Sequence, residues 1–165
     1  MPRIVSPLGP QISREKPRLA GATTHGAAKS TLECLILSSN GNRREFLSRA
    51  AAGSGWSTLV CADSEAARRL ANRIAVKLAI IELEGTPAVD IAGRHQFSAE
   101  LAKAGGPLLL LCGAERDRRQ EVWARQLGVW LYLPGLLESD VEGLGSLCGE
   151  ARFIVERNSF IATVP

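Results

Sequence analysis

Short apolar runs alternate with amphipathic stretches along most of the chain, and this alternation predicts strands separated by helices. The central run extends from Val76 to Gly85 and contains an unbroken apolar segment, Leu78–Ile81, followed by Glu82. A short apolar run of this kind is typical of a strand that helices cover on both faces. Four further strands are predicted at residues 32–38, 57–61, 108–111 and 129–133.

The segments between these runs carry apolar residues at helical spacing. Helices are predicted at residues 42–52, from Asp63 or Ser64 to about 74, at 94–104 and at 116–127. Pro87 argues against an earlier start for the third helix, so residues 84–91 are expected to form a loop. In the fourth helix, Val122, Trp123 and Leu127 are the expected buried residues.

The last part of the chain fits either helix or strand. Leu144, Leu147, Cys148 and Ala151 are spaced as the buried face of a fifth helix that ends near Glu156. Glycines in the same stretch each lower helix stability by ~1 kcal/mol relative to alanine. An extended form of residues 152–164, such as a hairpin, is therefore the alternative.

Alternating strands and helices of this length predict a single doubly wound α/β domain with a five-stranded parallel sheet and helices on both faces. Right-handed crossover connections leave few topologies. The expected strand order is 2-1-3-4-5, which places the functional cleft at the carboxyl ends of the first and third strands. Glu82 ends the predicted third strand and is therefore expected at this cleft.

The first thirty residues differ in character from the rest. Residues 1–30 contain four prolines and five basic side chains against one acidic side chain, without periodicity. We therefore expect a disordered basic tail at 1–30, a domain at 31–156 and a C-terminal tail at 157–165. The segment GATTHGAAKS at 21–30 resembles a phosphate-binding loop, but its lysine does not directly follow the second glycine and no strand precedes it.

The composition excludes several classes of protein. With 45% hydrophobic and 22% charged residues the chain is typical of a globular domain, and no apolar run approaches the ~20 residues that span a membrane. Cations without interleaved aromatics argue against nucleic acid as a partner. The four cysteines form no CxxC pair and neighbour no histidine. This pattern favours buried free thiols in the cytoplasm, with no metal and no cofactor.

Three segments in order, CADSEAARRLANRIAVKLAIIELEG, GGPLLLLCGAERD and GVWLYLP, resemble the receiver domain of bacterial two-component response regulators over residues 33–156. The resemblance implies a flavodoxin-like fold in which an aspartate after the third strand accepts a phosphoryl group from a histidine kinase. It also implies two acidic residues that help to hold Mg²⁺, a Thr or Ser after the fourth strand, and a Lys before a proline after the fifth. These groups stabilise the negative charge that phosphoryl transfer develops.

On this sequence every one of these positions is altered. The acidic pair falls on Ser38 and Ser39, the acceptor on Glu82, the hydroxyl on Cys112 or Gly113, and the lysine on Leu133. Losing the metal ligands together with the lysine removes several kcal/mol of transition-state stabilisation. The resemblance therefore predicts a degenerate pseudo-receiver that is not an enzyme and is not phosphorylated.

Two interpretations of Glu82 remain open. It could act as a built-in mimic of the phosphorylated state, although its single charge is below the ~−1.5 to −2 of a phosphoryl group. The simpler interpretation is a carboxylate that is solvated at the strand end or held by a helix N-terminus.

The expected function is signalling through protein–protein contacts. The resemblance implies a docking surface on the fourth helix, fifth strand and fifth helix, for a signalling protein or a second copy of the chain. On this sequence the surface would include Arg116, Arg118, Arg119, Trp123, Arg125 and Trp130, and Tyr132 would be the switch aromatic of the family or a packing residue. The alternative function is flavodoxin-like binding of a flavin or nucleotide, because SSNGN at 38–42 partly resembles a flavodoxin phosphate loop and precedes a helix N-terminus.

Overall fold

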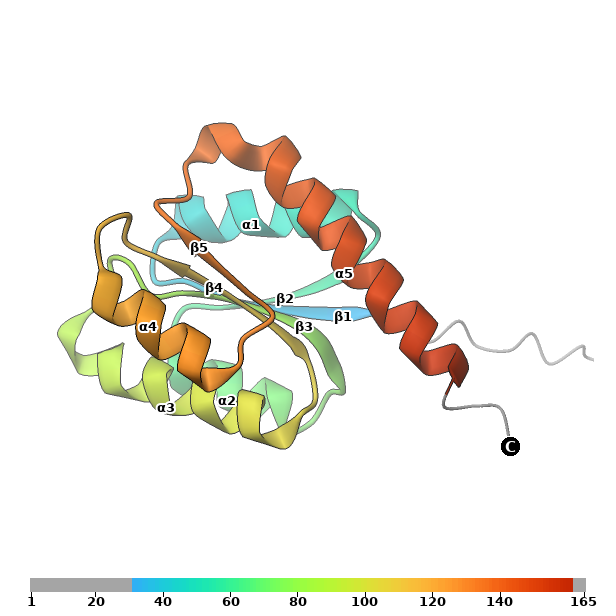
Figure 1. Cartoon of the computed structure of the whole chain (residues 1–165), viewed down its shortest axis with the longest axis horizontal. Helices are drawn as coiled ribbons and strands as arrows, with labels where there is room; N and C mark the ends of the chain where they lie inside the picture. The colour runs from blue at the N-terminus through green and yellow to red at the C-terminus, as the bar shows by residue number, and fades with distance from the viewer. Residues whose placement is uncertain (1–30, 162–165) are drawn as a thin grey trace, which may run out of the picture.

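A five-stranded parallel sheet forms the centre of the molecule, with strand order β2-β1-β3-β4-β5 (Figure 1). The computed structural model describes residues 31–161. The strands are β1 (Glu33–Leu37), β2 (Ser57–Cys61), β3 (Val76–Glu82), β4 (Leu108–Gly113) and β5 (Leu131–Pro134). All four pairings are parallel, so the predicted topology is confirmed.

Helices cover both faces of this sheet. They are α1 (Gly41–Gly53), α2 (Ser64–Ala71), α3 (Ala88–Ala104), α4 (Arg118–Leu127) and α5 (Val141–Ile161), with a short 3₁₀ turn, η1 (Glu138–Asp140), before α5. Figure 1 shows α1 and α5 on one face and α2, α3 and α4 on the other. The predicted basic tail and GATTHGAAKS, as well as residues 162–165, lie outside the described residues.

Alternation along the strands divides the core into two layers. On β1, Cys34 and Ile36 pack with α1 and α5, whereas Leu35 and Leu37 pack with α2, α3 and α4. The run Leu78–Ile81 is fully buried, as its unbroken apolar character predicts. Because all the strands are parallel, their carboxyl ends lie at one edge of the sheet, and Glu82 lies at this edge as the last residue of β3.

Helix α3 begins at Ala88, so the predicted start at Arg94 is wrong. Pro87 is the residue before the helix, with φ −58°. A proline at this position costs nothing, because the first helical N–H groups have no intrahelical acceptor in any case. Pro87 therefore marks the start of the helix and does not delay it.

The α4–β5 region also differs from the prediction. Val122 is 45% exposed and Ala124 is the buried residue of α4, so Val122 is wrong as a buried anchor. Gly128 ends α4 in the left-handed conformation at φ 76°, and the N–H of Val129 closes the helix by donating to Ala124 O at 3.4 Å. The fifth strand therefore begins at Leu131, two residues later than predicted.

Helix α5 continues to Ile161, so the predicted helix end near Glu156 is wrong. The same helix excludes a hairpin or an extended strand over residues 152–161. Leu144, Cys148 and Ala151 are buried against the sheet and α1, as predicted. Packing of this face stabilises the helix despite its glycines, and Arg152 pairs with Glu156 at 2.9 Å one turn on.

Candidate functional site at the end of β3

Glu82, the last residue of β3, is only 4% exposed. Its register partner on β4 is Cys112. A buried carboxylate needs a cation or several hydrogen-bond donors to remain charged. Here one cation and one hydroxyl donor contact the carboxylate.

Arg43 supplies the cation. Its Nε lies 2.6 Å from Glu82 Oε1, and the Ser38 hydroxyl donates to the other carboxylate oxygen. The side chains of Arg43 and Glu82 are 14% and 5% exposed, so the pair is shielded from water. Both oxygens of the carboxylate are therefore engaged.

Local structure at the start of α1 positions Arg43. Asn40 is the N-cap, and its side-chain oxygen accepts from Asn42 N at 2.9 Å and from Arg43 N at 3.3 Å. This cap starts the helix directly after β1, so the first turn lies over the carboxyl edge of the sheet. The Arg43 guanidinium also lies 5.3 Å from the centre of the Phe46 ring.

Arg43 has a further partner in the loop after β5. Its Nη1 donates to Leu136 O at 2.9 Å. A single side chain thus connects the end of β3, the start of α1 and the segment that leads into α5. Glu82 is neither solvated nor held by a helix N-terminus, so that interpretation is wrong.

A second arginine, Arg94 on α3, is fully buried beneath this site. Its Nε donates to Asp90 at 2.7 Å, and its Nη1 donates to the backbone oxygen of Glu82. Its Nη2 donates to the Ser39 hydroxyl and to Ala62 O, the latter at 3.1 Å. Arg94 therefore joins the ends of β1, β2 and β3.

Asp90 is the counter-charge of Arg94. Burial alone would raise the pKa of Asp90, but hydrogen bonds from Ser64 and Arg94 outweigh it, so the pKa lies below its usual value. The Ser64 N–H donates at 3.1 Å and the Ser64 hydroxyl donates to the same oxygen. The pair is thus a structural ion pair within a hydrogen-bonded network.

The structure places the predicted site positions together. Ser38 and Ser39 follow β1 and contact Glu82 and Arg94 respectively. Cys112 is the register partner of both Glu82 and Leu133. The Cys112 thiol is buried, and burial, followed by the charge of Glu82, raises its pKa to about 12.

This donor set does not fit a divalent cation. Mg²⁺ binds hard oxygen ligands, chiefly carboxylates, and here the two residues after β1 are serines. The carboxylate of Glu82 already forms an ion pair with the guanidinium of Arg43. Within residues 31–161, no group of three or more His, Cys, Asp or Glu side chains could hold a metal ion.

Sequence reasoning missed Arg43 and Arg94 as members of this site. A signal was present for Arg43: a cation in the first helical turn opposes the helix dipole, and α1 has no acidic residue there. Arg94 offered no comparable signal, because its burial depends on the unexpected first turns of α3.

The predicted interaction residues lie around α4 and β5. Arg116 and Arg119 are exposed. Trp123, Trp130 and Tyr132 are half-buried and pack against the two core layers.

Two of these aromatic side chains have specific partners. Trp123 stacks on His95 of α3, with ring centres 4.4 Å apart and an interplanar angle of 14°. Tyr132 places its hydroxyl 3.2 Å from Gln120 Oε1, to which it donates. Trp123 therefore contributes to α3–α4 packing.

The loop at 38–42 is closed to a flavin phosphate. Two of the N–H groups that such a phosphate would need already bond to Asn40. The guanidinium of Arg44 folds back and donates to Ser38 O and Ser39 O at 2.8 and 2.9 Å. These contacts argue against the flavodoxin-like alternative.

Known proteins resemble this chain in structure and not in sequence. No family model matches the chain, and no curated protein matches its sequence. Among solved structures, a CheY-like response regulator receiver domain protein of Methanospirillum hungatei is similar with a TM-score of 0.60 and 13% identity, covering 74% of this chain and 98% of its own. The signal receiver domain of a putative Luxo repressor protein of Vibrio parahaemolyticus gives 0.63 and 10%, covering 79% and 97%.

A Francisella response regulator receiver domain gives a TM-score of 0.61 at 15% identity and covers 78% of this chain and 99% of its own. No described helix is long and apolar enough to cross a membrane. At these sequence identities, the similarity to the three solved structures is one of fold. The chain has the fold of response regulator receiver domains.

Proposed function

We propose that the protein is a non-catalytic pseudo-receiver, a regulatory domain of two-component-type signalling that acts by protein–protein contact in the cytoplasm without being phosphorylated. The observation that carries this proposal is the double engagement of the Glu82 carboxylate by Arg43 and Ser38. A carboxylate that accepts a phosphoryl group must present a free oxygen to the incoming phosphorus atom.

The position of the cation supports the same conclusion. In phosphoryl transfer a cation helps when it contacts the transferred group. The Arg43 Nε contacts the acceptor carboxylate itself and stabilises it in the unreacted state. Attack of the Glu82 carboxylate on a phosphorus atom would first have to break this shielded pair. Residues 38 and 39 are serines, so neither offers a carboxylate with which the Arg43 guanidinium could pair instead.

The contact of Arg43 with Leu136 O supports a fixed conformation of the signalling surface. The same guanidinium holds both the segment after β5 and Glu82. We therefore propose one constant shape as the signal, and this contact network argues against Glu82 as a mimic that drives a switch.

The α4–β5 surface is the proposed docking site. β5 is an edge strand with half-buried Leu131, Tyr132 and Leu133, and such an edge is open to a partner. Arg116 and Arg119 are exposed next to it, and arginine is enriched at binding hot spots. The partner is a signalling protein or a second copy of the chain.

Intact-mass measurement after incubation with phosphoramidate and MgCl₂ tests the lack of phosphorylation. We expect no added phosphate, whereas a receiver domain with its aspartate and metal ligands, treated in parallel, should be modified. Phosphate on Glu82, located by fragmentation, would overturn the proposal.

Sedimentation velocity over a concentration series tests the second-copy form of the proposed interface. If the chain self-associates through α4 and β5, Arg119→Glu should weaken the association. Arg49→Glu is the control, because Arg49 is an exposed residue of α1 on another surface. A wild-type protein that stays monomeric would exclude a second copy as the partner.

A further inference from the structure

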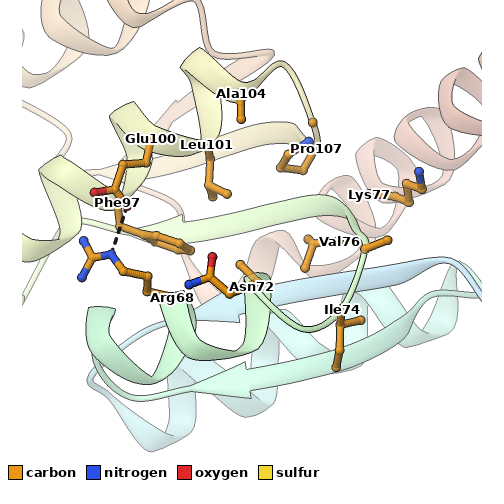
Figure 2. Close-up of a pocket in the computed structure, with 13 residues that line it drawn as sticks. Arg68, Asn72, Ile74, Val76, Lys77, Phe97, Glu100, Leu101, Ala104 and Pro107 are labelled. Carbon is orange, nitrogen blue, oxygen red and sulfur yellow. Dashed lines mark hydrogen bonds and ion pairs between the residues drawn. The ribbon is translucent and has the colours of Figure 1, made fainter.

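A groove opens between α2 and α3 at the amino ends of β3 and β4, the opposite end of the sheet from Glu82 (Figure 2). It forms because α2 has 8 residues and ends at Ala71, whereas α3 has 17 and continues to Ala104. The groove has a volume of about 440 Å³, which lies within the range of roughly 300–1,000 Å³ typical of ligand sites.

The walls of the groove are largely apolar. Figure 2 shows Phe97, Leu101, Val76 and Pro107 around the same space, with Ile74 at the turn into β3. Phe97 and Val76 belong to the core layer on this side of the sheet and are therefore held firmly. This surface suits an apolar side chain.

The charged side chains of the groove are paired or lie outside it. Arg68 Nε lies 3.0 Å from Glu100 Oε2, and Arg68 Nη1 lies 3.5 Å from Glu65 Oε2. Figure 2 shows the Lys77 side chain pointing away from the groove. The groove itself therefore favours apolar contact over a free ion.

A carboxylate without a partner lies beside the groove. Glu33, the first residue of β1, is the register partner of Val76, and its side chain lies on the same face of the sheet as Leu35, which packs with the helices that form the groove. Its Oε2 is buried without a hydrogen-bond partner among the described residues, and neither Arg73 nor Lys77 pairs with it. A buried acceptor in this state is costly and favours any donor that can reach it.

The chain enters β1 at this same edge of the sheet. Thr31 is the first described residue, so the thirty residues that precede it are attached close to the groove. They carry five basic side chains against one acidic side chain, which complements the charge of Glu33. Counting back from Thr31, the first large apolar residue is Leu19, and Arg18 lies directly before it.

We propose that residues 16–20 of the chain's own N-terminal segment dock in this groove. Leu19 packs against Leu101 in the groove, and the Arg18 guanidinium donates to the Glu33 carboxylate. For these residues the proposal replaces the disorder expected from composition. The groove shares no residue with the Glu82 site, so this inference stands independently of the proposed function.

Two features favour this segment over the rest of the first thirty residues. The entropic cost of closing a loop grows with its length, so Leu19 docks at lower cost than the more distant Ile12 or Leu8. Pro17 restricts the backbone before docking, and a segment that is already restricted loses less conformational entropy when it binds.

Nuclear Overhauser effects (NOEs) between methyl groups test the docking in the full chain, ¹³C-labelled at its leucine and valine methyl groups. We expect NOEs from Leu19 to Leu101 and Val76, and Leu19→Ala, which identifies the Leu19 signals, should lack them. The absence of NOEs between Leu19 and the groove would overturn the proposal. NOEs found only between labelled and unlabelled chains in a mixture would also overturn it, because they would place a second copy in the groove.

Variants in the segment and in the groove test the apolar contact. In ¹H–¹⁵N spectra, Leu19→Ser should shift the amide signals of the segments that line the groove, residues 68–77 and 97–107, whereas Leu8→Ser should leave them unchanged. Ala104→Gln fills the groove from an exposed helical position and should abolish the Leu19 NOEs. Lys103→Gln, at the preceding exposed residue, is its control. Unchanged NOEs in Ala104→Gln would contradict the proposed site.

A further pair of variants tests the charge contact. Arg18→Gln should lower the ratio of docked to free chains about two- to fivefold, which moves the groove amide signals from their wild-type positions towards those of Leu19→Ser. Arg3→Gln removes the same charge from a more distant position and should leave these signals in place. Equal spectra for Arg18→Gln and the wild type would contradict the pairing with Glu33.

Discussion

Arg43 Nε and Glu82 Oε1 lie 2.6 Å apart, in a pair that buries a cation from the first turn of α1 against the carboxylate that ends β3. The two residues are separated by β2, α2 and β3 in the chain. Their contact therefore forms only when α1 and β3 have come together at the carboxyl edge of the sheet. It also explains how a buried glutamate remains compatible with folding, because the guanidinium compensates the lost hydration.

Removing one partner of this pair should destabilise the fold strongly. Arg43→Met leaves the Glu82 carboxylate buried without its cation, and we expect the free energy of unfolding to fall by about 3–5 kcal/mol in urea titrations. Arg49→Met on the same helix should cost less than about 1 kcal/mol, because Arg49 is exposed and its pair with Glu45 spans 3.5 Å.

The double variant Arg43→Met/Glu82→Met distinguishes a lost pair from a general packing defect. With both charges absent, most of the lost stability should return, since buried pairs replaced by apolar groups are often neutral. A double variant as unstable as Arg43→Met would contradict the ion-pair explanation.

Arg94 should be at least as sensitive. Arg94→Leu leaves the Asp90 carboxylate without its cation and removes the guanidinium donors to Glu82 O and Ala62 O. We expect a loss of about 3–5 kcal/mol. Lys103→Leu, at an exposed residue of the same helix with no ion pair, is the control and should change the unfolding free energy by less than about 0.5 kcal/mol.

The Asp90 carboxylate should make stability depend on acid. Its pKa is lowered in the folded state by Ser64 and Arg94 against the opposing effect of burial. The folded state therefore binds this proton less readily than the unfolded chain, and the stabilisation is present above the usual value of 3.8 and is lost as the pH falls through the folded pKa.

Urea titrations between about pH 7 and pH 3 measure this dependence. Asp90→Asn should reduce stability at neutral pH and flatten the loss below about pH 4. Asp63→Asn is the matched control, because asparagine caps a helix as well as aspartate does. An unchanged acid profile in Asp90→Asn would show that the carboxylate does not carry the effect.

The architecture was accessible from sequence because each strand contains a short apolar run. A run such as Leu78–Ile81 indicates a strand that is buried on both faces. Right-handed crossover connections between parallel strands then restrict the possible strand orders. The positions Ser38, Ser39 and Cys112 could be placed at the edge from this order alone. Errors arose where capping decided the boundary, at Pro87 and at Gly128.

The chemistry of the edge was less accessible because it depends on long side chains that fold back. Amphipathic spacing treats Arg43 as solvent-facing. Its place in the first turn of α1 marks it as unusual, but it does not indicate that the guanidinium reaches across to β3 and Leu136. Arg94 was placed in the correct helix, but at its expected first turn, where burial is not anticipated. Tertiary distances decide these contacts, and hydrophobic periodicity does not encode them.

The cysteine thiols should be unreactive in the folded protein. All four are buried, and burial raises the pKa of Cys112 to about 12 and that of Cys148 to about 11. Since the thiolate is the reactive species, a chromogenic disulfide reagent at pH 8 should react with no thiol in native buffer and with all four in guanidinium chloride. Rapid native reaction would show that a thiol is accessible.

Shortening the acceptor should not create a phosphorylation site. Glu82→Asp restores the residue type that the receiver resemblance implies, but Ser38 and Ser39 still offer no metal ligand and Leu133 no cation. We expect intact-mass measurement with phosphoramidate and MgCl₂ to detect no phosphate, because the groups that stabilise the transferred charge remain absent. Circular dichroism should confirm that the variant is folded. If Glu82→Asp alone gains phosphate, the barrier lay in the length of the acceptor, and Arg43 would have to serve the transferred group after all.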